Sequence, residues 1–154
     1  MNIFIDADAC PVKDETLKVA ARYGLHTFIV SNGGMRPSRD PLVTTVTVPA
    51  GPDVADDWIA ERVERNDIVV TQDIPLAART LEQGGHAIGP SGKVFDIDSI
   101  GMALAMRELN QHIREATQGQ TKHRAFTDRD RSQFLQSLDK IATAAKAADK
   151  KENP

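Results

Sequence analysis

The chain lacks the features that mark membrane-spanning, secreted and strongly basic proteins. Its single cysteine, Cys10, cannot form an internal disulfide bond, which fits a reducing cytosol. No apolar run approaches the ~20 residues that a membrane-spanning helix needs, and the first residues do not have the basic and then apolar pattern of a signal peptide. The formal net charge of −3 provides no overall positive field to attract nucleic acid. We therefore expect a cytoplasmic protein that does not enter the membrane, in which any phosphate binding is local or acts through a bridging metal ion.

The remaining composition is that of one ordinary globular domain. Hydrophobic residues make up 40% of the 154 positions and charged residues 27%, and this length is near the commonest domain size. Residues 1–140 are predicted to form a single domain. Residues 141–154 are of low complexity and are predicted to form a frayed tail. Nothing in the sequence indicates an oligomeric state.

Short apolar segments that predict strands alternate with helical patterns. The strands are predicted at residues 3–5, 27–30, 44–48, 68–71 and 86–88, and the helices begin near Pro11, Asp53, Asp73, Ser99 and Thr127. This alternation predicts a three-layer α/β/α fold with a mainly parallel central sheet of about five strands. In such a fold the turns from strand to helix all lie along one edge of the sheet, where ligands bind.

Acidic residues follow nearly every predicted strand at this edge. They are Asp6 and Asp8 after the first strand, Asp53, Asp56 and Asp57 after the third, Asp73 after the fourth, and Asp96 and Asp98 after the fifth. Two carboxylates ~5 Å apart repel by roughly 3 kcal/mol at an effective dielectric constant of ~20, so a cluster requires protons or a cation. Oxygen ligands suit Mg²⁺ or Mn²⁺, and such ions activate water for attack at phosphorus.

The pattern therefore indicates a metal-dependent phosphoester hydrolase. Asp6, Asp8 and Asp73 are the predicted ion ligands, and Asp56 or Asp57 is predicted to complete the site, with the other facing solvent. Asp53 and Asp73 are also well suited to cap helices. Substrate contacts are predicted from four polar residues after the second strand: Ser31, Asn32, Arg36 and Arg39.

Four motifs resemble a known family. The segments Asp6–Val12, Gly51–Ile59, Thr71–Ala78 and Phe126–Phe134 occur in the same order and at similar spacing in the YaiI/YqxD family of bacterial proteins. That family is grouped with PIN-like domains. The resemblance implies a ribonuclease-type fold that depends on Mg²⁺ or Mn²⁺, with single-stranded RNA as substrate. It implies site acids at Asp6, at Asp56 or Asp57, at Asp73, and at Asp96 or Asp98.

Two other functions remain open from the sequence. Ile3 to Asp8 also resembles the first motif of haloacid-dehalogenase-like phosphatases, in which Asp6 would be a nucleophile and Asp8 a general acid, and Val30–Asn32 resembles their second motif. A protein that binds metal or RNA without turnover is the third possibility. Formation of an aspartyl-phosphate would indicate the phosphatase, and divalent-dependent binding without cleavage would indicate the binding protein.

Overall fold

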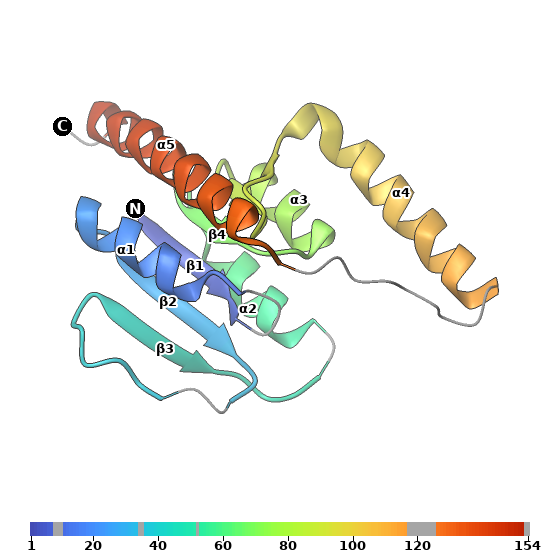
Figure 1. Ribbon diagram of the computed structural model, residues 1–154, viewed down its shortest axis with the longest axis horizontal. Helices are drawn as coiled ribbons and strands as arrows, with labels where there is room; N and C mark the ends of the chain where they lie inside the picture. The colour runs from blue at the N-terminus through green and yellow to red at the C-terminus, as the bar shows by residue number, and fades with distance from the viewer. Residues whose placement is uncertain (8–10, 34–35, 52, 117–125, 153–154) are drawn as a thin grey trace.

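The computed structural model describes residues 1–7, 11–33, 36–51, 53–116 and 126–152, with side chains described for all of these except 111–116. A twisted sheet lies between two layers of helices (Figure 1). The strands are β1 (Asn2–Asp6), β2 (His26–Ser31), β3 (Val43–Thr47), β4 (Ile68–Val70), β5 (His86–Ile88) and β6 (Val94–Phe95). The helices are α1 (Lys13–Tyr23), α2 (Val54–Arg62), α3 (Ile74–Glu82), α4 (Ile97–Ala116) and α5 (Asp128–Glu152).

The strand order explains where a ligand site can form. The sheet has the order β3-β2-β1-β4-β5-β6, and its first five strands are parallel. The chain therefore builds outwards from β1 to β3 and then returns to place β4 on the other side of β1. At such a reversal the connections leave in opposite directions, which opens a crevice at the carboxyl ends of the two central strands. Asp6 and the segment after β4 lie at this point.

The predicted α/β/α fold with a mainly parallel sheet is confirmed, with one additional strand. β6 pairs antiparallel with β5 through only two residues, Val94 and Phe95. A strand this short has no recognisable periodicity, so sequence patterns cannot reveal it.

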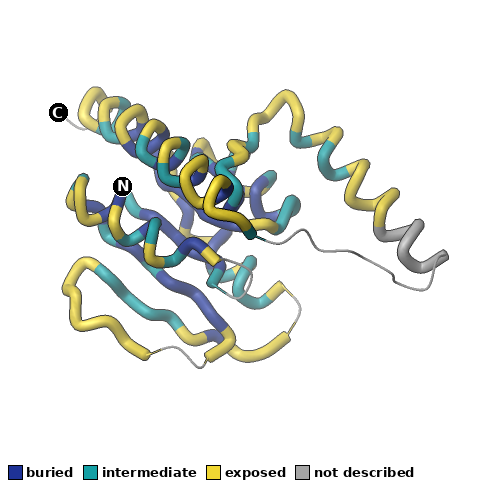
Figure 2. Tube along the Cα trace, in the orientation of Figure 1, coloured by how far each residue is buried: buried dark blue, intermediate teal, exposed yellow. Residues whose placement is uncertain are grey.

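Both faces of the sheet are buried, which explains why its central strands are almost continuously apolar. Successive residues of a strand point to opposite faces. On one face, Ile3 and Ile5 pack in a core that includes Phe134 and Leu138 of α5. On the other face, Phe4 packs in a second core formed with α2 and α3. Figure 2 shows the buried strands in the centre and the exposed outer faces of the helices.

Two helix ends are capped by residues suited to those positions. Gly24 adopts a left-handed conformation (φ 65°) after α1, and its N–H bonds to carbonyl groups of the last turn. At the start of α5, Thr127 and Asp130 form a capping box. The Thr127 N–H donates to Asp130 Oδ2 (3.0 Å), and the Asp130 N–H donates to Thr127 Oγ1 (3.1 Å).

The C-terminal region differs from the predicted frayed tail, because α5 continues to Glu152. Ile141, Ala142 and Ala145 are buried in this part of the helix. Lys146 Nζ donates to the carbonyl oxygen of Tyr23 (2.7 Å). Alanine is the best helix former, and its small side chain lets α5 pack closely against α1. The low-complexity sequence of this segment therefore forms an ordered helix.

Helix α4 projects from the rest of the molecule (Figure 1). No helix in the described part of the chain is both long enough and apolar enough to cross a membrane.

Candidate functional site

Thr71 joins the two central strands at the carboxyl edge of the sheet. Asp6 ends β1 and Thr71 directly follows β4, and the two strands are neighbours in the sheet, with Ile5 opposite Val70. Thr71 Oγ1 donates to Asp6 Oδ2 (3.0 Å) and accepts from the N–H of Asp73 (2.9 Å). Asp6 is only 7% exposed. One buried hydroxyl therefore fixes the Asp6 carboxylate relative to the backbone that carries Asp73.

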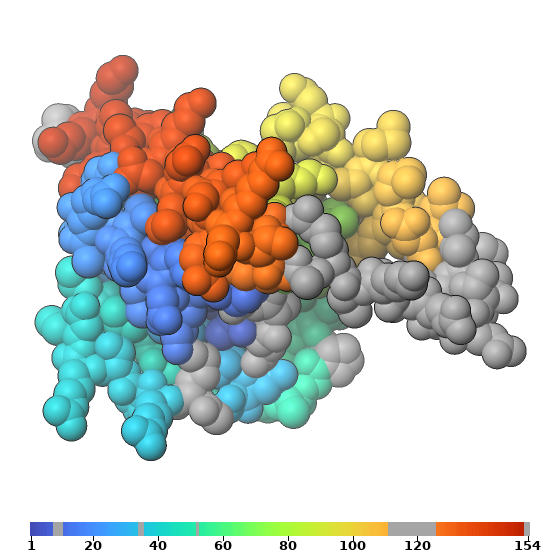
Figure 3. All heavy atoms as spheres, viewed as in Figure 1, coloured from blue at the N-terminus to red at the C-terminus, as the bar shows by residue number. Residues whose placement is uncertain are grey.

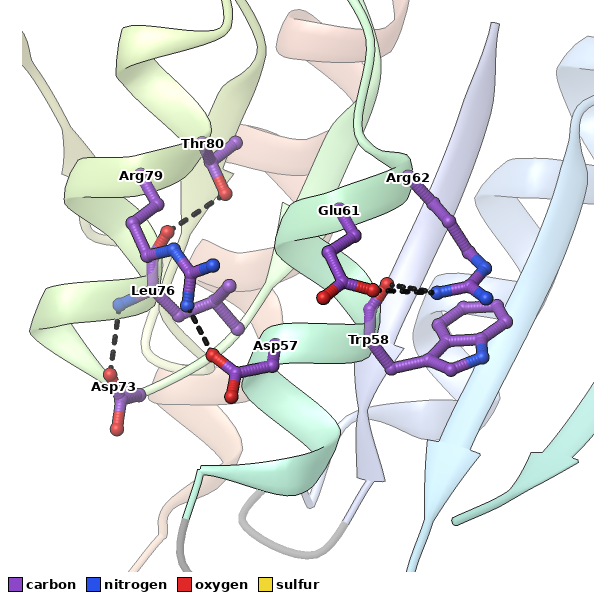
Figure 4. Close-up of polar contacts among 8 residues, drawn as sticks. All are labelled: Asp57, Trp58, Glu61, Arg62, Asp73, Leu76, Arg79 and Thr80. Atoms are coloured by element: carbon purple, nitrogen blue, oxygen red, sulfur yellow. Dashed lines mark hydrogen bonds and ion pairs between the residues drawn. The ribbon is translucent and has the colours of Figure 1, made fainter.

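Asp73 is the N-cap of α3, as predicted, and it also belongs to the acidic cluster. Its Oδ1 accepts from the N–H of Leu76 (2.9 Å), which satisfies a free donor in the first turn of the helix (Figure 4). Its side chain is also hydrogen-bonded to Asp56. Asp73 thus both caps α3 and contributes to the acidic cluster.

Asp56, in the first turn of α2, contributes the third carboxyl group. Burial is the largest cause that raises its pKa, followed by the charges of Asp73 and Asp6, the hydrogen bond to Asp73, and the charge of Asp53; together they raise the pKa from 3.8 to about 7. A hydrogen bond between two carboxyl groups requires a shared proton. Asp56 therefore keeps its proton to a higher pH than an ordinary aspartate does.

Asp57, the next residue, is paired with a basic side chain at the surface. Its Oδ1 accepts from Arg79 Nη1 of α3 (2.6 Å), and its side chain is 55% exposed (Figure 4). An exposed pair of this kind stabilises a protein by about 1 kcal/mol or less. The structure therefore separates the two adjacent acids: Asp56 joins Asp6 and Asp73, and Asp57 links α2 to α3 at the surface.

The other predicted acids start helices. Asp53 precedes α2 in a left-handed conformation (φ 65°), and its side chain makes no capping hydrogen bond. Asp96 is exposed and caps α4, where its Oδ1 accepts from the N–H of Ser99 (2.9 Å). Hydrogen bonds from Ser99 hold the pKa of Asp96 below its usual value. Asp98 is exposed in the first turn of α4.

The predicted substrate-binding residues are spread along the connection from β2 to β3. Ser31 ends β2 and is buried, and its Oγ accepts from the N–H of Gly33 (3.3 Å). Asn32 follows on the surface. Arg36 and Arg39 are exposed in the returning loop.

Arg39 lies near the opposite edge of the sheet. Its neighbour Asp40 accepts from the N–H groups of Leu42 and Val43 at the start of β3. Because β3 is parallel to β2, this start lies at the amino edge, away from the acidic residues.

Sequence reasoning did not include Thr71 among the site residues. The available signal was a hydroxyl residue directly after a buried strand and two residues before a helix-capping aspartate. Asp8 and Cys10 lie outside the described residues. Within the residues that the structure describes, no group of three or more His, Cys, Asp or Glu side chains is positioned to hold a metal ion.

Replacing Asp56 with asparagine should stabilise the protein at alkaline pH. The pKa of Asp56 rises from 3.8 to about 7 on folding, so the native state retains a proton that the unfolded chain loses, and the free energy of unfolding falls as the pH rises between these values. The whole pKa shift corresponds to about 4 kcal/mol of unfolding free energy. Solvent screening around this half-buried group reduces the expected gain to about 1–2 kcal/mol at pH ~8.

Urea unfolding in EDTA at pH ~4.5 and ~8 measures this difference. The gain should be small at the lower pH, where Asp56 is largely protonated in the native state and still partly protonated in the unfolded chain. The control is Asp57→Asn, which removes the exposed pair with Arg79 and should show no such increase with pH. Equal effects of Asp56→Asn at both pH values would contradict the clustered arrangement.

The comparisons with known proteins agree with the motifs. The family model described as uncharacterized BCR, YaiI/YqxD family matches residues 4–144. A UPF0178 protein from Parvibaculum lavamentivorans is 60% identical over 143 residues, which cover 93% of this chain and 94% of the relative. UPF0178 proteins from Agrobacterium fabrum and Caulobacter vibrioides are each 55% identical, over 145 and 150 residues, and these alignments cover 94% and 96% of this chain and 95% and 96% of the relatives. No solved structure matches the chain. The chain therefore belongs to the YaiI/YqxD family.

Proposed function

We propose that this protein is a PIN-like, metal-dependent phosphodiesterase that acts on single-stranded RNA. The observation that carries the proposal is the convergence of Asp6, Asp56 and Asp73 from three different elements. They meet where the strand order reverses, and hydrogen bonds through Thr71 and between Asp56 and Asp73 connect them. Open α/β sheets bind ligands at this position.

The oxygen donors of this cluster fit a hard divalent cation such as Mg²⁺ or Mn²⁺. Asp6 and Asp73 would hold it, together with Asp8 from outside the described residues. Binding would favour the charged form of Asp56, because the cation would offset the negative charges that now raise its pKa. When bound, the ion would stabilise negative charge on phosphate oxygens and lower the pKa of a coordinated water molecule.

The residues of the chain supply the remaining functions. Asp56 lies beside Asp6 and Asp73, and its charged form would accept a proton from an attacking water molecule. Thr71 holds Asp6 in place through its hydroxyl group. Asp73 sits at the N-terminus of α3, whose dipole favours a nearby phosphate group.

An assay on single-stranded RNA, single-stranded DNA and small phosphomonoesters tests the proposal. Each substrate is incubated with Mg²⁺, with Mn²⁺ and with EDTA. We expect cleavage of RNA with either metal, no cleavage in EDTA, and no covalent enzyme intermediate. Turnover of a phosphomonoester with a phosphoryl group trapped on Asp6 would instead establish the phosphatase. Metal-dependent RNA binding without cleavage by the purified protein would establish the non-catalytic alternative.

A further inference from the structure

A groove runs along helix α4, beside the segment that joins β4 to α3. Its larger part has a volume of about 730 Å³ and lies between α4 and the segment that follows β4. A smaller part of about 320 Å³ continues towards the start of α5. Both parts are lined by the same four residues, Gln72, Ile74, Lys93 and Phe95. Figure 3 shows α4 standing away from the body of the molecule on this side.

Two of the residues that line the groove flank Asp73 in the chain. They are Gln72 and Ile74. Gln72 also lies between Asp73 and Thr71, whose hydroxyl group bonds to Asp6. A polymer held in the groove would therefore lie beside the segment that carries Asp73.

The walls combine an aromatic ring, positive charges and exposed apolar side chains. Lys93 Nζ lies 5.8 Å from the centre of the Phe95 ring. On α4, Arg107 lines the groove beside Met102 and Met106, which are 68% and 47% exposed. Within the described residues, neither Lys93 nor Arg107 takes part in an ion pair, so both charges are available to a ligand.

We infer that this groove binds the nucleotides of a single-stranded RNA that lie on one side of the phosphodiester to be cleaved. This inference rests on the proposed function. Phe95 stacks on a base, and Lys93 and Arg107 contact phosphate groups. Aromatic rings combined with cations are the usual means of holding a single strand without reading its sequence. A purely apolar partner would leave these two cations buried and unpaired, which is unfavourable. The methionines adapt their shape to different bases.

Binding of a fluorescein-labelled oligouridylate, measured by fluorescence anisotropy in EDTA, tests this inference separately from cleavage. Phe95→Leu keeps an apolar side chain but removes the ring, and we expect it to weaken binding roughly 5- to 150-fold. Arg107→Ala should weaken binding and reduce the slope of log affinity against log salt by about 0.7, as expected for one lost phosphate contact with a single strand. Lys140→Ala, which removes an exposed lysine of α5, is the matched control and should leave both quantities unchanged.

The outcomes distinguish this inference from the proposed function. Asp6→Asn should still bind the labelled strand in EDTA, although its cleavage of RNA with metal should be roughly a hundred- to a thousandfold slower. Suppose that the wild-type protein cleaves RNA but that neither Phe95→Leu nor Arg107→Ala weakens binding. The inference about the groove would then be wrong, and the proposed phosphodiesterase activity would still hold. If the two variants weaken binding but the wild-type protein does not cleave RNA, the groove binds RNA and the proposed phosphodiesterase activity is wrong. If oligodeoxyuridylate binds equally, the groove recognises single strands of either sugar. If the two variants alter only self-association, measured by sedimentation, the groove is a protein interface and the inference is wrong.

Discussion

Replacing Asp6 with asparagine should lower metal-dependent RNA cleavage on the order of a hundred- to a thousandfold while leaving the protein folded. The substitution removes a negative charge at the point where β1 and β4 meet, and the amide oxygen can still accept the hydroxyl hydrogen of Thr71. Initial rates with Mn²⁺ measure the loss, and circular dichroism reports on folding.

The adjacent acids of α2 provide a matched comparison for this experiment. Asp56→Asn should reduce activity strongly, because Asp56 belongs to the cluster. Asp57→Asn should leave activity close to that of the wild type, because Asp57 is paired with Arg79 at the surface. Equal losses of activity in the two variants would contradict the assignment of Asp56, and not Asp57, to the catalytic cluster. RNA cleavage that persists in Asp6→Asn with EDTA present would come from a contaminating nuclease.

The position of the site could be predicted from the sequence because it depends on strand order. Asp6 and Asp73 each follow a short apolar strand, and parallel strands end at the same edge. The sequence does not specify that β4 lies beside β1, and this pairing is what brings the segment after β4 to Asp6. The sequence therefore predicts that Asp6 and Asp73 share one edge of the sheet, as they do, whereas the hydrogen-bonded link through Thr71 is seen only in the structure.

The choice between Asp56 and Asp57 shows why individual side chains are harder to predict. Neighbouring residues on a helix point about 100° apart, so one of the two acids was expected to face solvent, and this is confirmed. Which one does so depends on how α2 packs against α3, including the position of Arg79. That contact joins residues far apart in the chain, and the pattern within α2 contains no information about it.

Composition misled the interpretation of the last fourteen residues for a different reason. Alanine and lysine repeats are common in disordered tails, and they are also strong helix formers. The deciding factor is whether one face of the helix finds a partner. In this protein α1 supplies it, and Ala142 and Ala145 are buried.

Deleting residues 141–154 should therefore destabilise the protein by about 4–7 kcal/mol. Loss of a buried isoleucine, Ile141, costs about 2–5 kcal/mol. Each lost hydrogen bond, such as those of Lys146 with Tyr23 and of Glu152 with Asn66, costs about 1 kcal/mol. Since a domain of this size is stable by only about 5–15 kcal/mol, the melting temperature should fall by roughly 10–20 °C or the chain should not fold. A frayed tail would leave the melting temperature unchanged.

Two aspartate substitutions in the same turn of α5 test the cause of this effect even if the deleted chain does not fold. Ala145 is 1% exposed and its neighbour Ala144 is exposed. Ala145→Asp places a charge on the buried face of α5, whereas Ala144→Asp places the same charge in solvent at nearly the same cost in helix propensity. We expect the first variant to lose several kcal/mol of unfolding free energy, because an unpaired charge is buried, and the second to lose about 0.5 kcal/mol. Urea unfolding measures both values. Similar values for the two variants would mean that this part of α5 does not pack against the domain.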